Sequence, residues 1–188
     1  MSITLLAALA IGPVMAWASN PELESHKPSQ AAADVFRQLT GADMAFLPAG
    51  LVKSVDAVTD LSQLMVYPTD TLSVVKLTGA QVRLALERSV SLAPLPSSAF
   101  LQLSGLTVTY SKSAAPDKRI ISVQVGDSKL SDSATYQVAM PTTLARGGLG
   151  YFKVWDKSKI DRTLEGQSLE SILTGKRPTE SADRWIAN

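Results

Sequence analysis

The run Arg146-Gly147-Gly148-Leu149-Gly150-Tyr151 holds three glycines within four positions. It follows directly on an alternation of apolar positions, Tyr136, Val138 and Met140, which is typical of a half-buried strand. Glycine at this density after a strand indicates backbone that turns tightly or comes close to another group. Two interpretations are open here: a loop whose N–H groups approach a ligand, or a tight turn into residues 151–155.

A second punctuated block lies upstream, where Thr78 and Gln81 have the spacing of a capping box. The apolar residues after it recur at helical spacing and form one face: Val82, Ala85, Leu86 and Val90. We therefore predict a helix that begins after Thr78, and capping alone accounts for this block.

The other patterns mix helices and strands without a regular β-α-β alternation. Helices are predicted over residues 29–40, with Gly41 as C-cap, over a short stretch capped by Asp60, and over 165–174. Strands are predicted over 44–47, 72–77, 101–103, 106–110, 121–125 and 136–140. The expected fold is α+β, with a mixed, largely antiparallel sheet packed against helices.

Composition limits the classes of function. The 188 residues are 45% hydrophobic and suit one domain, which we expect over residues 19–188. A net charge of +1 and scattered basic residues argue against nucleic acid as a partner. There is no cysteine, and the sole histidine, His26, stands in a polar stretch where we expect it to be solvated. We propose no metal ligand and no cofactor.

Residues 1–18 have the form of a secretory signal that is cleaved after Ala18. The apolar run is interrupted by Gly12-Pro13 and is short for a membrane span, although no Lys or Arg precedes it. The expected location is periplasmic or secreted, with no stable membrane span after cleavage. A retained N-terminal anchor is the alternative.

Five segments, in this order and spacing, resemble the C-terminal domain of the 5'-nucleotidase and UDP-sugar hydrolase family. They are residues 41–50 (GADMAFLPAG), 77–81 (LTGAQ) with Leu86-Glu87, 100–106 (FLQLSGL), 136–139 (YQVA) and 147–151 (GGLGY). The resemblance covers roughly residues 25–187. It implies the fold of that domain, here as a stand-alone domain.

In the family, an N-terminal domain holds two metals and a catalytic His-Asp pair, and the C-terminal domain recognises the nucleotide. This sequence resembles only the second part, so the resemblance implies no catalysis by this chain alone. It implies a nucleotide or phosphorylated small molecule as ligand, and a separate metallophosphoesterase chain as partner.

The recognition positions of the family are partly replaced. An Asn-Ala-Gly-Gly-Ile-Arg segment corresponds to residues 48–53, which places Lys53 where a phosphate-directed arginine would stand. Lysine keeps the charge but not the bidentate geometry, and a solvated surface charge is the alternative. A Pro-Phe-x-Asn element corresponds to residues 67–70, so Tyr67 could supply a ring one position early and Asp70 replaces the amide.

A second stacking aromatic corresponds to Thr143, and the aspartate of a Gly-Gly-Asp-Gly-Tyr loop corresponds to Leu149. The resemblance thus implies that the residues that form the fold are kept, whereas the residues that bind the nucleotide are largely replaced. The candidate ligand-binding residues are Lys53, Tyr67, Asp70, Arg146, Gly147, Gly148 and Tyr151. No catalytic residue is assigned.

Three functions remain open at this point. The first is an exported, non-catalytic domain that binds a nucleotide-like or anionic small molecule. The second is the recognition half of a split 5'-nucleotidase that works with a separate metallophosphoesterase chain. The third is a structural or protein-interaction module with a degenerate site.

Overall fold

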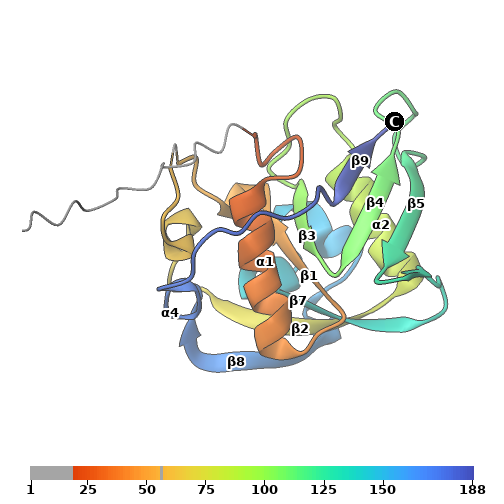
Figure 1. The fold of residues 1–188 in the computed structure, drawn as a ribbon. Helices are drawn as coiled ribbons and strands as arrows, with labels where there is room; N and C mark the ends of the chain where they lie inside the picture. Colours follow the sequence, from red (N-terminus) through yellow and green to blue (C-terminus); the bar gives the residue numbers. More distant parts are fainter. Residues whose placement is uncertain (1–18, 56) are drawn as a thin grey trace, which may run out of the picture.

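The computed structural model describes residues 19–55 and 57–188, so the signal predicted over residues 1–18 lies outside the described residues. The described chain forms two sheets with helices packed around them (Figure 1). One sheet has the order β3-β1-β7-β2-β8 and the other the order β6-β5-β4-β9. The strands are β1 (Met44–Pro48), β2 (Thr71–Thr78), β3 (Leu101–Ser104), β4 (Leu106–Tyr110), β5 (Ile120–Val125), β6 (Ser128–Lys129), β7 (Thr135–Pro141), β8 (Ile160–Ser168) and β9 (Trp185–Ala187).

Two longer helices and several short ones complete the fold. The α-helices are α1 (Lys27–Thr40), α2 (Gly79–Ser89), α3 (Thr142–Ala145) and α4 (Leu169–Leu173). The 3₁₀ helices are η1 (Ala49–Leu51), η2 (Leu61–Leu64), η3 (Gly148–Lys153) and η4 (Lys157–Lys159). The capping boxes predicted at Asp60 and Thr78 are both present, and Thr78 begins α2 as expected.

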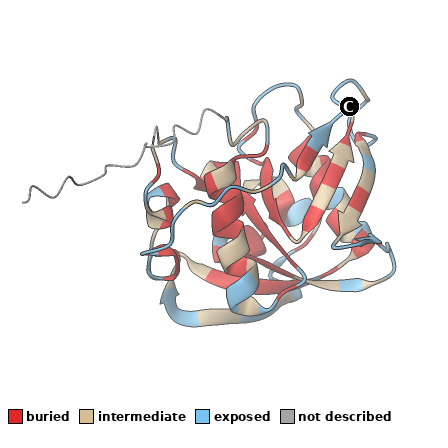
Figure 2. Cartoon of the chain, in the orientation of Figure 1, coloured by how far each residue is buried: buried red, intermediate tan, exposed pale blue. Residues whose placement is uncertain are grey.

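The five-stranded sheet is buried on both faces, because alternate side chains of its central strands enter two different hydrophobic clusters. In β1, Met44 and Phe46 belong to one cluster, whereas Ala45 and Leu47 belong to the other. The same alternation occurs in β7, where Ala139 lies between two members of the first cluster. Figure 2 shows this burial in the central strands, while the edge strand β8 is mostly exposed or half-buried.

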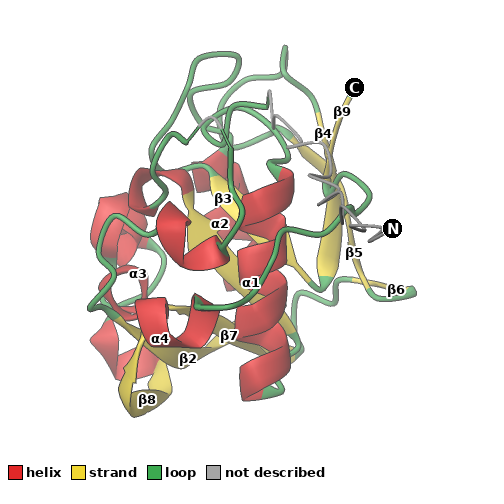
Figure 3. Cartoon of the chain, turned by 60° about the vertical axis from the view of Figure 1, so that its left-hand side comes forward, coloured by secondary structure: helices red, strands yellow, loops and turns green. Residues whose placement is uncertain are grey.

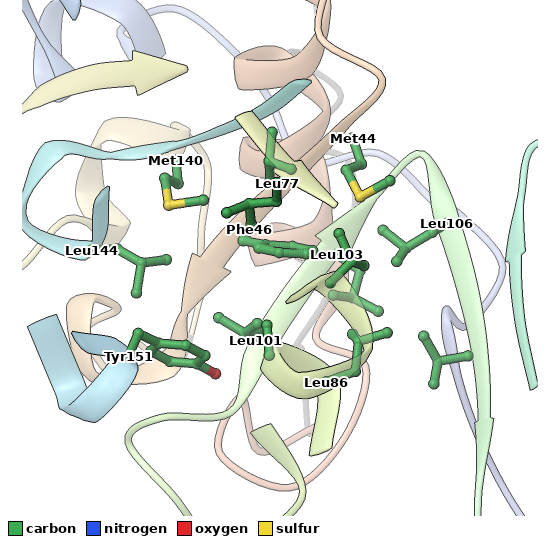
Figure 4. Packing of buried hydrophobic residues seen from close by; sticks show 14 of the residues in the cluster. Met44, Phe46, Leu77, Leu86, Leu101, Leu103, Leu106, Met140, Leu144 and Tyr151 are labelled. Atoms are coloured by element: carbon green, nitrogen blue, oxygen red, sulfur yellow. The ribbon is translucent and has the colours of Figure 1, made fainter. Parts of the chain in front are cut away.

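The first cluster fills the space between the five-stranded sheet, α2 and the four-stranded sheet. Figure 4 shows Phe46, Leu101 and Leu103 meeting Leu86 of α2 and Leu106 of β4. The second cluster lies on the opposite face of the sheet, under α1, η2 and α4. Figure 3 shows α1 and α4 side by side over this face. The predicted α+β class is therefore confirmed.

The sheets are mixed but largely antiparallel, as predicted. Only two neighbouring pairs among the described strands are parallel: β1 with β7, and β4 with β9. The β1–β7 pair joins Met44 to Val138 and places two distant parts of the chain at the centre of the sheet.

The helix predicted over residues 165–174 is shorter than expected. Residues 160–168 form β8, which pairs with β2, and α4 begins only at Leu169. The Ser168 side chain accepts a hydrogen bond from the N–H of Ser171 and so sets the start of the helix. Gly166, at φ 75°, could not lie inside a regular helix without leaving this conformation.

The prediction that His26 is solvated was wrong. His26 is 4% exposed, and its Nδ1 lies 2.7 Å from the Ser29 hydroxyl. The backbone N–H of His26 donates to Oε1 of the buried Gln102. The side-chain amide of Gln102 donates in turn to the carbonyls of Pro21 and Glu24. The polar residues around His26 thus fasten the start of the described chain to β3. Burial lowers the pKa of His26 to about 4.

Candidate ligand-binding edge of the central sheet

Three loops meet at one edge of the five-stranded sheet, and together they carry the predicted site residues. Strands β1 and β7 are parallel neighbours, so the loops that follow them leave the sheet on the same side. Strand β2 runs antiparallel to β7, with Leu72 opposite Pro141, so the loop before β2 lies on that side too. We call this set of loops, residues 48–53, 67–70 and 142–152, the recognition edge.

Asp70 holds two of these loops together. One oxygen of its carboxylate accepts a hydrogen bond from the N–H of Thr143 at 3.1 Å, and the other accepts from Thr71 at 2.8 Å. The N–H of Asp70 also donates to the Tyr67 carbonyl, which closes a turn. The carboxylate is thus occupied by backbone donors, and its observed contacts are those of a residue that positions the loops.

Hydroxyl groups add to this connection beside α3. The Thr142 hydroxyl lies 2.8 Å from that of Thr71 and 2.7 Å from that of the buried Ser73. Ser73 in turn lies 2.8 Å from the Thr163 hydroxyl on β8. This chain of hydroxyls satisfies polar groups inside the sheet and fixes where the loop after β7 begins.

Lys53, Tyr67 and Arg146 are the exposed members of the predicted set. The N–H of Lys53 donates to the Leu64 carbonyl, and Val52 pairs with Met65, which places Lys53 on the strip of chain that lies beside the Tyr67 loop. Tyr67 is 55% exposed, and Arg146 lies on the turn after α3. Among the described residues, these three side chains form no hydrogen bond or ion pair.

Gly147 and Gly148 lie where the chain leaves no room for a side chain. Gly147 has φ 88°, and a Cβ atom there would lie 2.8 Å from Cα of Phe152. A Cβ atom on Gly148 would lie 2.7 Å from the Thr143 carbonyl oxygen. Both glycines are therefore required by close approach of the chain to itself. A tight turn explains them without any ligand.

Leu149 has a left-handed backbone, with φ 56°, although it is not a glycine. Its side chain points toward the loop after β1, where Cδ2 lies 3.3 Å from the position a Cβ on Gly50 would take. It also packs against both hydrophobic clusters. An apolar side chain thus occupies the space between two loops of the recognition edge.

Tyr151 lies in the core and is not accessible to a ligand. It is fully buried, its hydroxyl donates to the Ala99 carbonyl at 2.6 Å, and its ring stacks on Trp155 at 4.9 Å. Burial raises the pKa of Tyr151, so the hydroxyl remains neutral. Its place in the glycine motif therefore serves packing.

Two residues in or beside the recognition edge were not singled out from the sequence. Arg88, at the end of α2, donates from Nη2 to the Leu149 carbonyl at 2.9 Å and covers Gly150. Phe152 follows the glycine loop directly and is 65% exposed. An exposed aromatic next to a glycine run was the available signal for Phe152, whereas the position of Arg88 depends on how α2 packs.

The exposed groups at the recognition edge thus include two cations, Lys53 and Arg146, and two rings, Tyr67 and Phe152. Such groups can bind an anion and contact a flat apolar surface. Among residues 19–55 and 57–188, no three His, Cys, Asp or Glu side chains are grouped so that they could hold a metal ion. Nor does any helix in these two ranges have the length and apolarity to cross a membrane.

Comparison of the sequence with known proteins gives matches that all name 5'-nucleotidases. The family model described as 5'-nucleotidase, C-terminal domain, matches residues 15–156. A 5'-nucleotidase-related protein from Glossina morsitans morsitans is 34% identical over 135 residues, which are 64% of this chain and 24% of that protein. The snake venom 5'-nucleotidase of Naja atra is 33% identical over 90 residues, 44% of this chain and 17% of that protein.

Solved structures agree in fold. A 5'-nucleotidase precursor from Thermus thermophilus aligns with a TM-score of 0.72 at 21% identity, over 88% of this chain and 36% of that one. The NAD nucleotidase of Haemophilus influenzae aligns with a TM-score of 0.66 at 18% identity, over 93% of this chain and 36% of that one. The chain spans less than two fifths of the length of each of these four proteins. Since the family model matches most of the sequence and the folds agree, the chain belongs to the 5'-nucleotidase C-terminal domain family.

Proposed function

We propose that this domain recognises a small anionic ligand of the nucleotide type at its recognition edge and does not itself catalyse a reaction. The observation that carries the proposal is the convergence of three loops that present Lys53, Tyr67 and Arg146 to solvent. Two cations on neighbouring loops favour a phosphate group, and the exposed rings of Tyr67 and Phe152 offer a surface for a base.

The proposed ligand is bound more weakly than a full nucleotide site would bind it. Lys53 makes point-charge contacts in place of a bidentate fork, and Thr143 offers no ring. Stacking of one base on an aromatic side chain contributes about 1–3 kcal/mol in nucleic-acid complexes, so a lost ring alone would weaken binding by about five- to 150-fold. We expect dissociation constants in the millimolar range.

Isothermal titration with AMP, a UDP-sugar and inorganic phosphate tests this proposal. AMP and the UDP-sugar should bind more tightly than phosphate if both the charge and the rings contribute. Lys53→Gln and Arg146→Gln should each weaken all three, whereas Lys129→Gln, on β6 of the other sheet, serves as the matched control. Absence of heat with all three ligands at millimolar concentration would contradict small-molecule binding.

A second candidate function is that of a protein-interaction module, and the position of Leu149 favours it. Its side chain fills space between two loops where the family places an acid, and the exposed Phe152 stands nearby in the same loop. In this function the recognition edge faces a protein. Replacement Leu149→Asp would then leave nucleotide binding absent, whereas in a merely weakened site it should increase affinity for AMP or the UDP-sugar.

The partner in either function is proposed to be a metallophosphoesterase, encoded separately or as another part of a longer chain. The matched proteins are about three to six times the length of their shared region, which supports such a partner. Mixing the domain with a metallophosphoesterase encoded by a neighbouring gene, in the presence of a divalent metal, should then raise phosphatase activity above that of the metallophosphoesterase alone. We propose export to the periplasm or medium on the basis of residues 1–18, to be checked by the N-terminal sequence of the mature protein.

A further inference from the structure

A small pocket lies apart from the recognition edge, where the start of the described chain crosses the turn after α2. Its volume is about 160 Å³, and it is lined by residues 22–24, 89–90, 93–95, Phe100, Tyr110 and Lys112. The red N-terminal segment and the loop between α2 and β3 lie side by side there (Figure 1). None of these residues belongs to the loops described above.

The walls of the pocket are held in place by hydrogen bonds. The N–H of Ser97 donates to the Glu22 carbonyl at 3.1 Å, and Gln102 donates to the carbonyls of Pro21 and Glu24 at 2.8 Å each. The Ser89 hydroxyl accepts from the N–H of Leu101 at 2.8 Å. The cavity therefore exists between anchored segments and does not depend on a free loop.

Tyr110 supplies a polar group that faces this cavity. The residue is 2% exposed, and its ring meets the Trp185 ring edge-on at 5.4 Å. Among the described residues, its hydroxyl has no hydrogen-bond partner, although the side chain lines the pocket. The hydroxyl itself is accessible from the pocket, so it can bind a group that enters the cavity.

The charges around the cavity favour a cation. Glu22 and Glu24 line it together with a single ammonium group, Lys112, and no ion pair joins either carboxylate to a described cation. Arg119 lies behind the wall, where its guanidinium donates to the carbonyls of Ala93 and Lys112. The buried carboxylate of Glu87 lies beside this residue and accepts from the backbone N–H of Arg119.

The neighbouring charges also affect the pKa of the Tyr110 hydroxyl. Burial raises the pKa of Tyr110, the Glu24 carboxylate raises it further, and Arg119 opposes Glu24 more weakly. The hydroxyl is therefore neutral at pH 7 and lies close enough to the Glu24 carboxylate for that charge to act on it. A group with a positive charge and N–H donors would interact with both the hydroxyl and the carboxylate.

The rest of the lining is apolar and includes one ring. Leu23, Val90 and Phe100 surround the polar end of the cavity. Phe100 packs on Trp185 at 5.0 Å, so the aromatic side chains form a continuous floor with Tyr110. A cavity of about 150 Å³ accommodates a benzene-sized molecule in other proteins, so the size suits a ring with a short polar arm.

We propose that this pocket binds a small organic cation, a primary amine with an apolar or aromatic body. The ammonium group would donate to the Glu24 carboxylate and the Tyr110 hydroxyl. The body of the ligand would lie against Leu23, Val90 and Phe100, where a cation beside an aromatic face is also favourable. This site is independent of the recognition edge and of its ligand.

Benzylamine is the probe for this proposal, and the indole N–H signal of Trp185 in two-dimensional NMR of the full chain is the reporter. The expected result is a saturable shift at millimolar benzylamine, with the Trp155 signal unchanged, since that indole donates to Leu144 elsewhere in the core. Benzyl alcohol, the neutral analogue, should bind about ten-fold more weakly because it lacks the charge.

Two variants identify the contacts. Tyr110→Phe keeps the ring and removes the hydroxyl, and Glu24→Gln removes the charge at an exposed position. Each variant should weaken the binding of benzylamine by about three- to ten-fold, whereas Glu170→Gln on α4 should leave the affinity unchanged. The absence of a saturable Trp185 shift, equal affinity for benzyl alcohol, or unaltered binding by both variants would each overturn the proposal.

Discussion

Glu87 is an interior carboxylate whose two oxygens accept hydrogen bonds from the N–H groups of Arg119 and Ile120, at 3.0 and 2.8 Å. It ties α2 to the chain where β5 begins, which explains a charged residue on the buried side of that helix. Asp70 acts similarly, because its carboxylate joins the loop before β2 to Thr143 after β7. At this scale, single polar side chains determine where the loops lie.

His26 should make stability depend on pH in a defined window. Its pKa is lowered to about 4 by burial, whereas the ring in the unfolded chain is protonated below about pH 6.5. Between these values the unfolded state binds more protons, so the free energy of unfolding falls as the pH decreases from about 6.5 to 4. We expect a loss on the order of 2 kcal/mol over this range.

Urea unfolding at several pH values checks this expectation. The variant His26→Gln cannot titrate there, so its stability should vary less between pH 6.5 and 4. If the wild-type protein and the variant show the same pH profile, the ring is not buried in its neutral form.

Gly147 and Gly166 offer a matched pair for the glycine loop. Both have left-handed backbones, with φ 88° and 75°, but a Cβ on Gly147 would meet Phe152 whereas none of the described atoms lies within 4 Å of one on Gly166. Gly166→Ala should cost only the backbone strain, about 1–2 kcal/mol. Gly147→Ala should cost more, about 3 kcal/mol or above, because the loop must also move.

Chemical denaturation of the two variants measures the difference. Equal losses of stability would show that the close approach between Gly147 and Phe152 is easily relieved.

At the scale of elements, periodicity predicted the parts of the fold whose burial is strongest. Helices α1 and α2, and strands β1, β2, β4 and β7, lie where the apolar spacing places them. Strand β8 was not predicted, because as an edge strand it buries little and its alternation is weak. Strand β9 is three residues long and is defined by pairing with β4, which no local pattern reveals.

The same limit applies to the recognition edge. The sequence pointed to residues in each of its three loops, but their convergence follows from a strand order that the sequence did not predict. The exposure of Lys53 and the burial of Tyr151 depend on packing between distant segments. The left-handed backbone of Leu149 was also unpredicted, because leucine has no preference for it.

The capping box of α2 can be tested at this scale. The Thr78 hydroxyl accepts from the N–H of Gln81 at 3.2 Å, and the Gln81 side chain accepts from the N–H of Thr78 at 3.1 Å. Thr78→Ala should lower the free energy of unfolding by about 1 kcal/mol, whereas Thr78→Ser should retain most of it. Thermal unfolding of both variants is the measurement, and equal stabilities of the two would argue against the cap.

At the scale of the whole molecule, two parallel pairs join segments that are distant in sequence. One pair lies at the centre of the five-stranded sheet, and the other places β9 beside β4. Arg184 adds to the second closure, because it donates to Asp34 on α1 at 2.7 Å and to the Leu103 carbonyl. The domain is thus completed by contacts between its first helix, its middle strands and residues 184–187.

Trp185 should therefore contribute more to the stability of the domain than its place in a short strand suggests. Its indole donates to the Leu101 carbonyl at 2.6 Å, and its ring packs on Phe100 and Tyr110. Trp185→Ala should lower the free energy of unfolding by about 3–5 kcal/mol. Ile186→Ala, at a neighbouring position that is 48% exposed, should cost about 0.5 kcal/mol or less.

Urea unfolding curves of the two variants, followed by circular dichroism, provide the test. Similar losses for both would mean that β9 contributes through its backbone alone.

The position of Trp185 also bears on how the protein is made. A ribosome adds residues from the N-terminus onward, so β3 and β4 emerge well before the indole that fills the space beside them. Until residue 185 is released, Leu101, Phe100 and Tyr110 lack their partner and their apolar surface is open to the surroundings. The final closure of this domain must therefore follow the synthesis of nearly all of it, and an unfinished chain should be the form most in need of protection from aggregation.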